Sequence, residues 1–307
     1  MRKLAFSLTV VVSFLLGTGI AVASTNGPHG NYSADTNACG QCHSTHTAQA
    51  PNLIAFTLDG VDNSVYETCV FCHKLGGASK YDVVNGAIRT TDAAGNPVVY
   101  RASGGGFINV VTVEGDLATY QMAPVTSAHD VKSQSVTGAP GGDPNTTFTK
   151  SCSNCHDPHG TPNSRQLLST VNGVTGLAPT LTVTNPLGDE TVEYNSGFND
   201  FCGACHTDFN VTTAGSGDIN TGIYTSYKRH RVGMDPSTLP NYNPNNGLPL
   251  EKNGTNPGVV SCMTCHYAHG TEKVSTITWT RSNGGTSTSS ALLRMNERGV
   301  CQACHNK

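Results

Sequence analysis

Cysteine and histidine stand in one repeated pattern along this chain of 307 residues. There are twelve of each, and every cysteine belongs to a Cys-x-x-Cys-His motif that occurs six times with no cysteine left over. The six motifs are Cys39, Cys42 and His43; Cys69, Cys72 and His73; Cys152, Cys155 and His156; Cys202, Cys205 and His206; Cys262, Cys265 and His266; and Cys301, Cys304 and His305.

This spacing is typical of c-type haem attachment. Two thiols separated by two residues can both form thioether bonds to one edge of a porphyrin, and the next histidine is then held against the iron as its proximal ligand. The sequence therefore predicts six covalently bound haem c groups, attached to the twelve cysteines. The six motif histidines are their predicted proximal ligands.

Three other interpretations of the cysteines have to be compared with haem attachment. An even number of cysteines in an exported chain also fits a disulfide framework. One Cys-x-x-Cys pair fits half of a zinc ribbon or a redox dithiol. A zinc ribbon does not require a histidine after every pair, and a redox dithiol occurs singly, near a βαβ pattern that this chain lacks. The six repeats favour haem.

The remaining six histidines match the number of predicted irons. They are the candidate distal ligands His29, His46, His129, His159, His230 and His269. Methionine is the alternative distal ligand and would raise the reduction potential. The methionines beyond Met1 are Met122, Met234, Met263 and Met295, and Met263 lies inside a motif. The equal counts favour two histidines at every iron.

Three of these histidines follow a motif histidine by three residues, at His46, His159 and His269. Such residues are at most about 10 Å apart even in an extended chain. The two axial ligands of an iron approach from opposite faces of the porphyrin. We therefore expect each of the three to bind a haem other than that of its own motif, which would pack haems closely.

The ligands repeat in three units, at about residues 24–80, 125–210 and 225–307. Each unit has a single histidine, a doubled Cys-x-x-Cys-His-x-x-His motif and a plain motif. The sequence at 166–168 matches that at 291–293 in the next unit. The most economical wiring gives the second histidine of a doubled motif to the second haem of its unit, and the single histidine to the first haem. Wiring exchanged between units or between chains satisfies the same counts.

Residues 1–23 have the features of a secretory signal peptide. The positive residues Arg2 and Lys3 precede an apolar run, and Ala21 and Ala23 form a cleavage site before Ser24. A retained membrane anchor is the alternative. Cleavage leaves a haem-binding domain at residues 24–307, with 16 basic and 21 acidic residues and a net charge of −5. That charge argues against nucleic-acid binding. We predict an exported protein without a transmembrane anchor.

The predicted fold is mostly irregular and loop-rich, because Gly, Pro, Asn, Ser and Thr fill the segments between motifs. Short α-helices are expected at the motifs. A few small β-hairpins are expected at 81–84 with 87–90, 98–101 and 107–113, and at 180–184 with 191–194. The three glycines at 104–106 predict a turn. About 47 residues per haem are too few for a large polypeptide core, so a chain of haems is expected to form the interior.

An iron with two histidine ligands has no open position for a substrate. The predicted role is therefore electron transfer at low potential, with no catalytic residues and no enzymatic reaction.

The six motifs, the doubled forms at 39–46, 152–159 and 262–269, and the stretch 28–32 resemble the secreted multihaem c-type cytochromes of metal-reducing bacteria. The resemblance implies an extracellular or outer-surface conduit to acceptors such as metal oxides. Its implied partners are other cytochromes or outer-membrane conduits. Similar hexahaem members polymerise into nanowire filaments in which a histidine of one subunit binds a haem of the next, and His29 would be the expected donor. Two alternatives are a monomeric periplasmic carrier and a reductase with one open haem, if His29 or His129 binds no iron.

Overall fold

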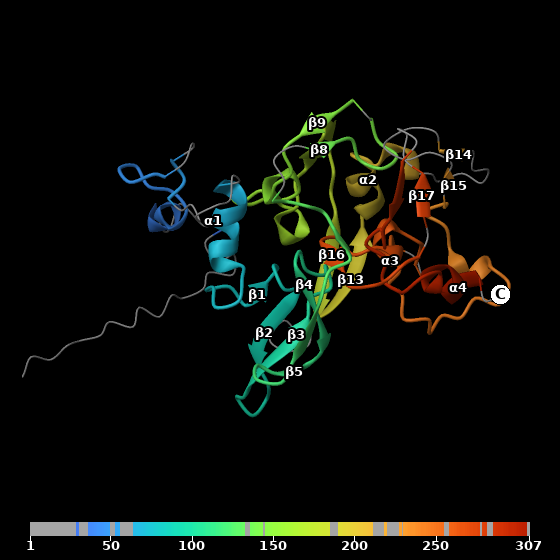
Figure 1. The fold of residues 1–307 in the computed structure, drawn as a ribbon, viewed down its shortest axis with the longest axis horizontal. Coiled ribbons are helices and arrows are strands. Elements are labelled where there is room, and N and C mark those ends of the chain that lie inside the picture. The colour runs from blue at the N-terminus through green and yellow to red at the C-terminus, as the bar shows by residue number, and fades with distance from the viewer. Residues whose placement is uncertain are drawn as a thin grey trace, which may run out of the picture.

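The chain is elongated, and its order in sequence is largely its order in space (Figure 1). The computed structural model describes residues 29–30, 36–49, 53–55, 64–132, 136–143, 145–184, 190–210, 218–219, 227–228, 230–254, 258–276, 278–280 and 285–305. The predicted signal peptide lies outside the described residues. In Figure 1 the deep blue segment at residues 36–49 lies at one end of the long axis, and the red C-terminal helix lies towards the other.

Short helices occur at all six motifs; four are α-helices, as predicted, and those at the first and third motifs are 3-10 helices. They are η1 (Thr36–Gln41), α1 (Ser64–Cys72), η3 (Cys152–Asn154), α2 (Phe198–Gly203), α3 (Cys262–Cys265) and α4 (Gly299–His305). One helical turn brings residues three apart onto one face, which suits two thiols that bind one porphyrin edge. At α3 the turn is fixed by Thr264, whose Oγ1 accepts a hydrogen bond of 2.9 Å from the Ser261 amide.

The linker after the second motif forms an antiparallel sheet of four strands in the order β1-β2-β3-β5. Its strands are β1 (Tyr81–Asp82), β2 (Ala87–Thr91), β3 (Pro97–Arg101) and β5 (Gly115–Asp116). A separate hairpin joins β4 (Asn109–Val113) to β6 (Gln121–Pro124). The predicted strands are therefore confirmed in place. Three of them, β1, β2 and β3, form one sheet with β5, whereas β4 pairs apart from it with β6.

The other strands form antiparallel pairs. The longest pair is β12 (Thr180–Thr184) with β13 (Thr191–Ser196), where the second hairpin was predicted. The remaining pairs are β7 (Ser127–Ala128) with β16 (Gly270–Thr271), β8 (Val136–Thr137) with β9 (Thr147–Phe148), β10 (Thr170–Val171) with β11 (Val174–Thr175), β14 (Asp218–Ile219) with β15 (Tyr227–Lys228), and β17 (Thr278–Thr280) with β18 (Thr286–Thr288). Three further 3-10 turns are η4 (Ser164–Gln166), η5 (Thr207–Phe209) and η6 (Pro236–Thr238).

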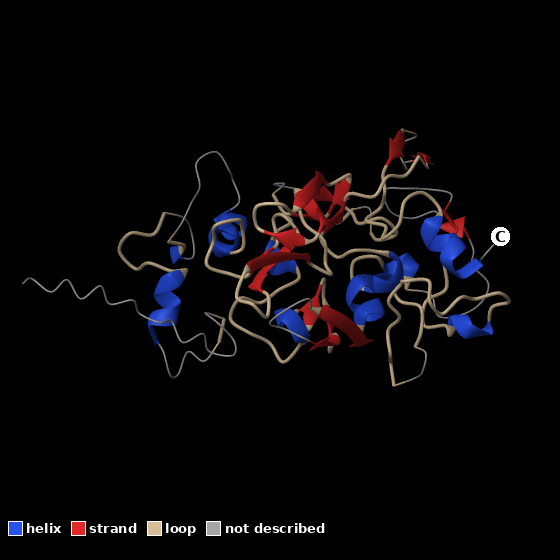
Figure 2. Cartoon of the chain, turned by 90° about the horizontal axis from the view of Figure 1, so that it is seen from below, coloured by secondary structure: helices blue, strands red, loops and turns tan. Residues whose placement is uncertain are grey.

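The polypeptide core is divided into small clusters. Each of the four clusters among the described residues contains three or four buried apolar side chains, and the largest consists of Leu167, Tyr194, Phe198 and Met263. Figure 2 shows short helices and strands spread along a chain that is mostly loop. The loop-rich fold class is thus confirmed. Among the described residues, no helix has the length and apolarity that a bilayer-crossing segment needs.

The three doubled motifs share one local structure. Their histidines form isolated β-bridges to Ile54, Leu167 and Leu293. In each case the preceding residue, Leu53, Gln166 or Leu292, has a positive φ of 57° or 58°. The equivalent residues are therefore Leu167 and Leu293. The sequence match of 166–168 with 291–293 was wrong by one position, because it followed side-chain likeness and could not detect which residue bridges the histidine.

Candidate haem-binding sites

Ten of the twelve histidines lie in five pairs. The pairs are His29 with His73, His43 with His159, His129 with His206, His156 with His269, and His230 with His305. The ring centroids of each pair are 6.0 to 6.3 Å apart. Every pair joins a motif histidine to one of the other six. The structure therefore brings together the two predicted ligand types and never two of one type.

This separation fits two imidazoles that bind one metal from opposite sides. Two metal–nitrogen bonds of about 2.0–2.1 Å account for roughly 4 Å of it, and the two ring radii for the rest. The angle between the rings ranges from 13° in the His43–His159 pair to 67° in the His230–His305 pair. Such variation is expected, because a ring can rotate about its metal–nitrogen bond without lengthening it. The residues present thus fit a bis-histidine haem iron.

The pairing corrects the expected wiring. His159 and His269 face the first motif histidine of the preceding unit, at His43 and His156. The single histidines His29, His129 and His230 face the second motif histidine of their own unit. The ring pairs disagree with the economical wiring and match the exchange between units that the sequence left open. Contacts between distant segments hold His269 in its place, since β7 pairs with β16 and the His129 amide donates to the His269 carbonyl at 2.9 Å.

Backbone carbonyls orient most of these rings. The Nδ1 atoms of four motif histidines lie 2.6 to 3.1 Å from the carbonyl oxygens of Tyr81, Arg165, Pro140 and Ala291, for His73, His156, His206 and His266 respectively. His29, His129 and His230 have the same contact with Pro158, Ala268 and Arg231. A carbonyl accepts only from a protonated Nδ1, so Nε2 is the nitrogen left to bind a metal. A metal-binding histidine is usually fixed in this way by its second nitrogen.

Burial keeps two distal candidates neutral. Removal from water lowers the pKa of His129 to about 4, and the neighbouring His206 adds to the effect. Burial likewise lowers the pKa of His269 to about 3, with His156 contributing. Neutral imidazole is the form that binds a metal. His159 is more exposed, and its Nδ1 lies 3.4 Å from an Asp157 carboxylate oxygen.

The cysteine pairs of consecutive motifs are neighbours along the whole chain. The thiols of Cys69 and Cys152 are within hydrogen-bond reach, as are those of Cys202 and Cys262. Burial raises the pKa values of Cys42, Cys155 and Cys265, and the nearby thiols of Cys69, Cys205 and Cys304, respectively, raise them further. The attachment points therefore succeed one another in space in the order of the sequence.

All twelve histidines are among the described residues. Two of them have no histidine ring opposite them there. His266 is held by the Ala291 carbonyl at 2.6 Å but faces no second imidazole in the described chain. His46 is exposed on the segment after η1. They are one motif histidine and one distal candidate, and Figure 1 shows their segments at opposite parts of the long axis. His29, the expected donor to a neighbouring subunit, instead faces His73 in its own chain.

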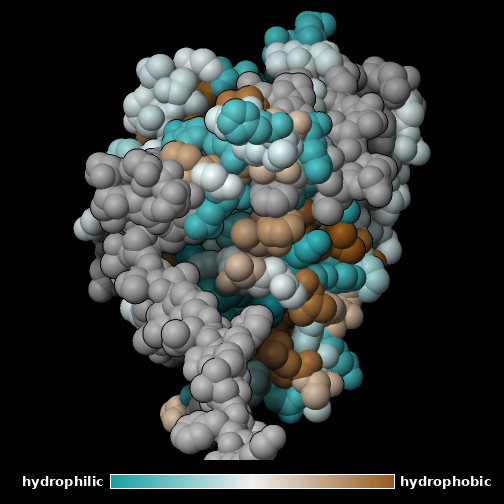
Figure 3. All heavy atoms as spheres, turned by 90° about the vertical axis from the view of Figure 1, so that its left-hand side faces the viewer, coloured by the Kyte–Doolittle hydropathy of each residue, from teal (hydrophilic) through white to brown (hydrophobic). Residues whose placement is uncertain are grey.

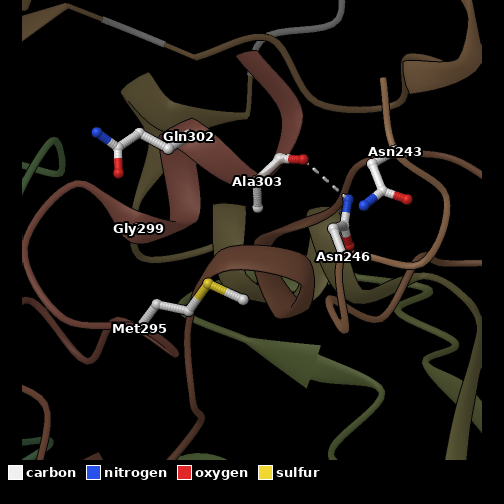
Figure 4. A pocket seen from close by; sticks show the side chains of 6 residues that line it. All are labelled: Asn243, Asn246, Met295, Gly299, Gln302 and Ala303. Carbon is white, nitrogen blue, oxygen red and sulfur yellow. Dashed lines mark hydrogen bonds between the residues drawn. The ribbon is translucent and has the colours of Figure 1, made fainter. Parts of the chain in front are cut away.

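A cavity of about 350 Å³ adjoins the last motif. It is lined by Asn243, Asn246, Met295, Gly299, Gln302 and Ala303. Figure 4 shows Ala303 of α4 around this space together with Met295 and Asn246, which come from other segments. Asn246 also lies 3.9 Å from the Cys304 sulfur. Met295 is thus close to the last motif, but His230 is the side chain that faces His305. Met263 is buried in the largest apolar cluster.

The glycines at 104–106 do more than form a turn, and the sequence did not reveal their contact. The Gly104 carbonyl accepts a hydrogen bond of 2.8 Å from the His269 amide. A Cβ on Gly104 would lie 3.2 Å from His269 Nδ1, and one on Gly105 would overlap the Gly270 carbonyl. Backbone without side chains is therefore needed where this linker packs against the fifth motif.

Gly105→Ala is expected to destabilise the protein and to displace His269 from its partner His156. Gly105 has a φ of +75°, which alone costs a residue with a Cβ about 1–2 kcal/mol, and the overlap with Gly270 adds to this. Thermal unfolding and the fraction of high-spin iron in the haem-loaded protein measure the two effects. Gly95→Ala is the control, because Gly95 has a φ of +87° in open space. Equal losses in both variants would contradict the packing role.

One family model matches the chain, described as the doubled CXXCH motif. It matches residues 29–77 and 146–174, which contain the first three motifs and the paired residues His29 and His159. No curated protein and no solved structure matches the chain. Covalent binding of haem c and a role in electron transport follow from the matched motifs. The doubled motif indicates that the chain is a multihaem c-type cytochrome.

Proposed function

We propose that this protein binds six haem c groups, each with two histidine ligands, and conducts electrons along them outside the cytoplasm to external acceptors such as metal oxides. The observation that carries the proposal is the set of five histidine pairs, each with one motif histidine and one distal candidate. When bound, each haem supplies one reversible one-electron couple. The protein supplies attachment, two ligands and a fixed order.

The arrangement of the thiols supports a linear path. Because consecutive motifs have neighbouring cysteines, each predicted haem has its sequence neighbours beside it. Histidines of neighbouring units also face each other, since His159 and His269 each lie opposite the motif histidine of the preceding doubled motif. Such a path has an entry at one end of the molecule and an exit at the other.

The repeat also supports a head-to-tail filament, as the second part of the proposal. Two doubled motifs send their second histidine to the first haem of the preceding unit. Among the three units of this chain, His46 of the first and His266 of the third are the two histidines that face no second histidine ring in the described residues. A second copy placed as the next unit would bring its His46 to His266. A contact between two different surfaces that does not close produces a fibre.

The end of the molecule near His46 carries exposed apolar side chains, which a contact between copies would cover. Leu53, Phe71 and Leu75 are exposed beside the first two motifs. Figure 3 looks at this end, where the described apolar residues form small groups between hydrophilic ones. Haem edges and a second copy of the chain would both cover such groups. His46, and not His29, is therefore the donor that the proposal assigns.

Export rests on the predicted signal peptide, and surface location on the resemblance to secreted cytochromes of metal-reducing bacteria. A monomeric periplasmic carrier is the first alternative. A reductase is the second, and one observation favours it: His266 lacks a second imidazole in its own chain, so an isolated monomer would have an open iron there. His29 and His129, the earlier candidates for such an open site, both face a motif histidine.

Haem content and spin state test the proposal directly. The purified protein is expected to contain six haems per chain by alkaline pyridine absorption and by intact mass. Filaments are expected to be entirely low-spin, whereas dissociated monomers should have one high-spin iron in six. Fewer than six haems, or high-spin iron at several sites, would contradict the six bis-histidine sites. Secretion is tested separately, by recovery of the protein in the cell-surface fraction.

A further inference from the structure

A single buried carboxylate, that of Glu190, binds three side chains from two distant parts of the chain. Its Oε1 accepts hydrogen bonds of 2.7 Å from both Lys80 and Tyr81, and its Oε2 accepts one of 2.9 Å from Arg165. The side chain of Glu190 is fully buried, while those of Lys80 and Arg165 are about one-third exposed. Both cations also lie over the Tyr81 ring, each 4.7 Å from its centroid.

Two of these three partners orient haem ligands. The Tyr81 carbonyl lies 3.1 Å from His73 Nδ1, and the Arg165 carbonyl lies 2.8 Å from His156 Nδ1. Glu190 therefore fixes the side chains of both residues whose backbone accepts from a ligand ring. Glu190 is therefore linked to two predicted iron ligands, to His73 through Tyr81 and to His156 through Arg165.

The two histidines belong to neighbouring predicted haems of different units. His73 ends the second motif and His156 ends the third, and the thiols of Cys69 and Cys152 are within hydrogen-bond reach. Glu190 thus lies where the first unit meets the second, and joins the ligand supports across that junction.

Only His73 and His156 have this support among the described motif histidines for which a carbonyl acceptor at Nδ1 is identified. The corresponding carbonyls for His206 and His266 belong to Pro140 and Ala291, whose side chains have no polar atom. No carboxylate can fix those residues in the same way.

Stability alone does not account for a buried charge here. A buried ion pair contributes little net free energy compared with apolar side chains of similar size, because both charges lose their hydration. What three directional hydrogen bonds provide is geometry. The hydrogen bond at Nδ1 sets the orientation of a ligand imidazole and raises its basicity, and a more basic ligand stabilises the oxidised iron.

We propose that Glu190 is a positioning residue that sets the ring orientation and the reduction potential of two neighbouring haems together, those attached through Cys69 and Cys72 and through Cys152 and Cys155. The inference rests on the proposed bis-histidine haems. It adds that these two sites respond as a unit and the other four do not.

The test compares three variants of the haem-loaded protein by potentiometric titration and low-temperature electron paramagnetic resonance. Glu190→Gln removes the charge and replaces one of the two acceptor oxygens with an NH2 donor. Tyr81→Phe keeps the charge and removes only the link towards His73. Glu272→Gln is the control, because Glu272 is a buried carboxylate paired with Arg101 and Lys273, neither of which offers its carbonyl to a ligand histidine in the described chain.

In Glu190→Gln, two of the six reduction steps should move to higher potential and two low-spin signals should shift, since these signals report the relative orientation of the axial rings. Tyr81→Phe should shift one of those two and leave the other. Glu272→Gln should leave both signals in place. A uniform shift of all six steps in Glu190→Gln, or an unchanged Tyr81→Phe, would overturn the inference. If Glu190→Gln does not take up six haems, Tyr81→Phe alone decides. A wild-type protein without haem would overturn the proposed function instead.

Discussion

His159→Met is expected to raise the potential of one haem, the one attached through Cys39 and Cys42. The His159 ring is 6.2 Å from that of His43, so a thioether in its place would bind the same iron. Exchange of histidine for methionine raises the potential, by up to a few hundred millivolts within the roughly 0.8 V range that axial ligands set. Potentiometric titration followed in the visible spectrum measures the change as one displaced step in six.

The affected haem can be identified by removing the competing one. With Cys202→Ala and Cys205→Ala, the fourth motif cannot attach haem, and under the economical wiring that haem would be the target of His159. The displaced step should persist in this background. Its disappearance would show that His159 binds within its own unit. His269→Met is the matched variant, with the haem of Cys152 and Cys155 as its expected target.

His46→Ala is expected to abolish filament formation while leaving the fold of the chain intact. His46 is exposed and faces no other histidine among the described residues, so its removal costs little stability in the monomer. Loss of a ligand to the neighbouring copy leaves the iron held by His266 with an open position. Electron microscopy and the high-spin fraction, expected at one iron in six, measure the two consequences in one preparation.

Two further variants sharpen this experiment. Thr45→Ala changes the exposed neighbour of His46 and should polymerise normally. His46→Met retains a metal ligand, so filaments should return with a raised potential at the haem of Cys262 and Cys265. Filaments of His46→Ala indistinguishable from wild type would contradict ligation between copies. A wild type that stays monomeric at every concentration would contradict the filament and leave the wiring within the chain intact.

Local features were predictable from the sequence because they depend on local spacing. The helices follow from cysteine pairs three residues apart, and the strand at Ala87–Thr91 follows from its β-branched residues between turn residues. The ligand types were predictable in the same way. A histidine directly after Cys304, for example, can only be delivered to the haem that Cys304 holds, so its role did not depend on the rest of the fold.

The wiring was not predictable, because it depends on contacts between distant segments. The segment that carries His269 is held by residues far away in the sequence, because β16 pairs with β7 and because Gly105 allows the backbone of the 104–106 turn to approach Gly270. A turn and a close approach have the same glycine pattern in a sequence. Glu190 was missed for a similar reason: its partners lie 25 to 110 residues earlier, and a single glutamate carries no local signal of such contacts.

The most direct test of the proposed haem chain is a cryo-electron microscopy map of the haem-loaded protein, in which each iron and its two axial ligands are visible. We expect six haems in the order of their motifs, with His159 on the iron of Cys39 and Cys42, His269 on that of Cys152 and Cys155, and a neighbouring copy's His46 on that of Cys262 and Cys265. A map with His159 bound to the haem of Cys202 and Cys205, or with haems out of sequence order, would contradict the account.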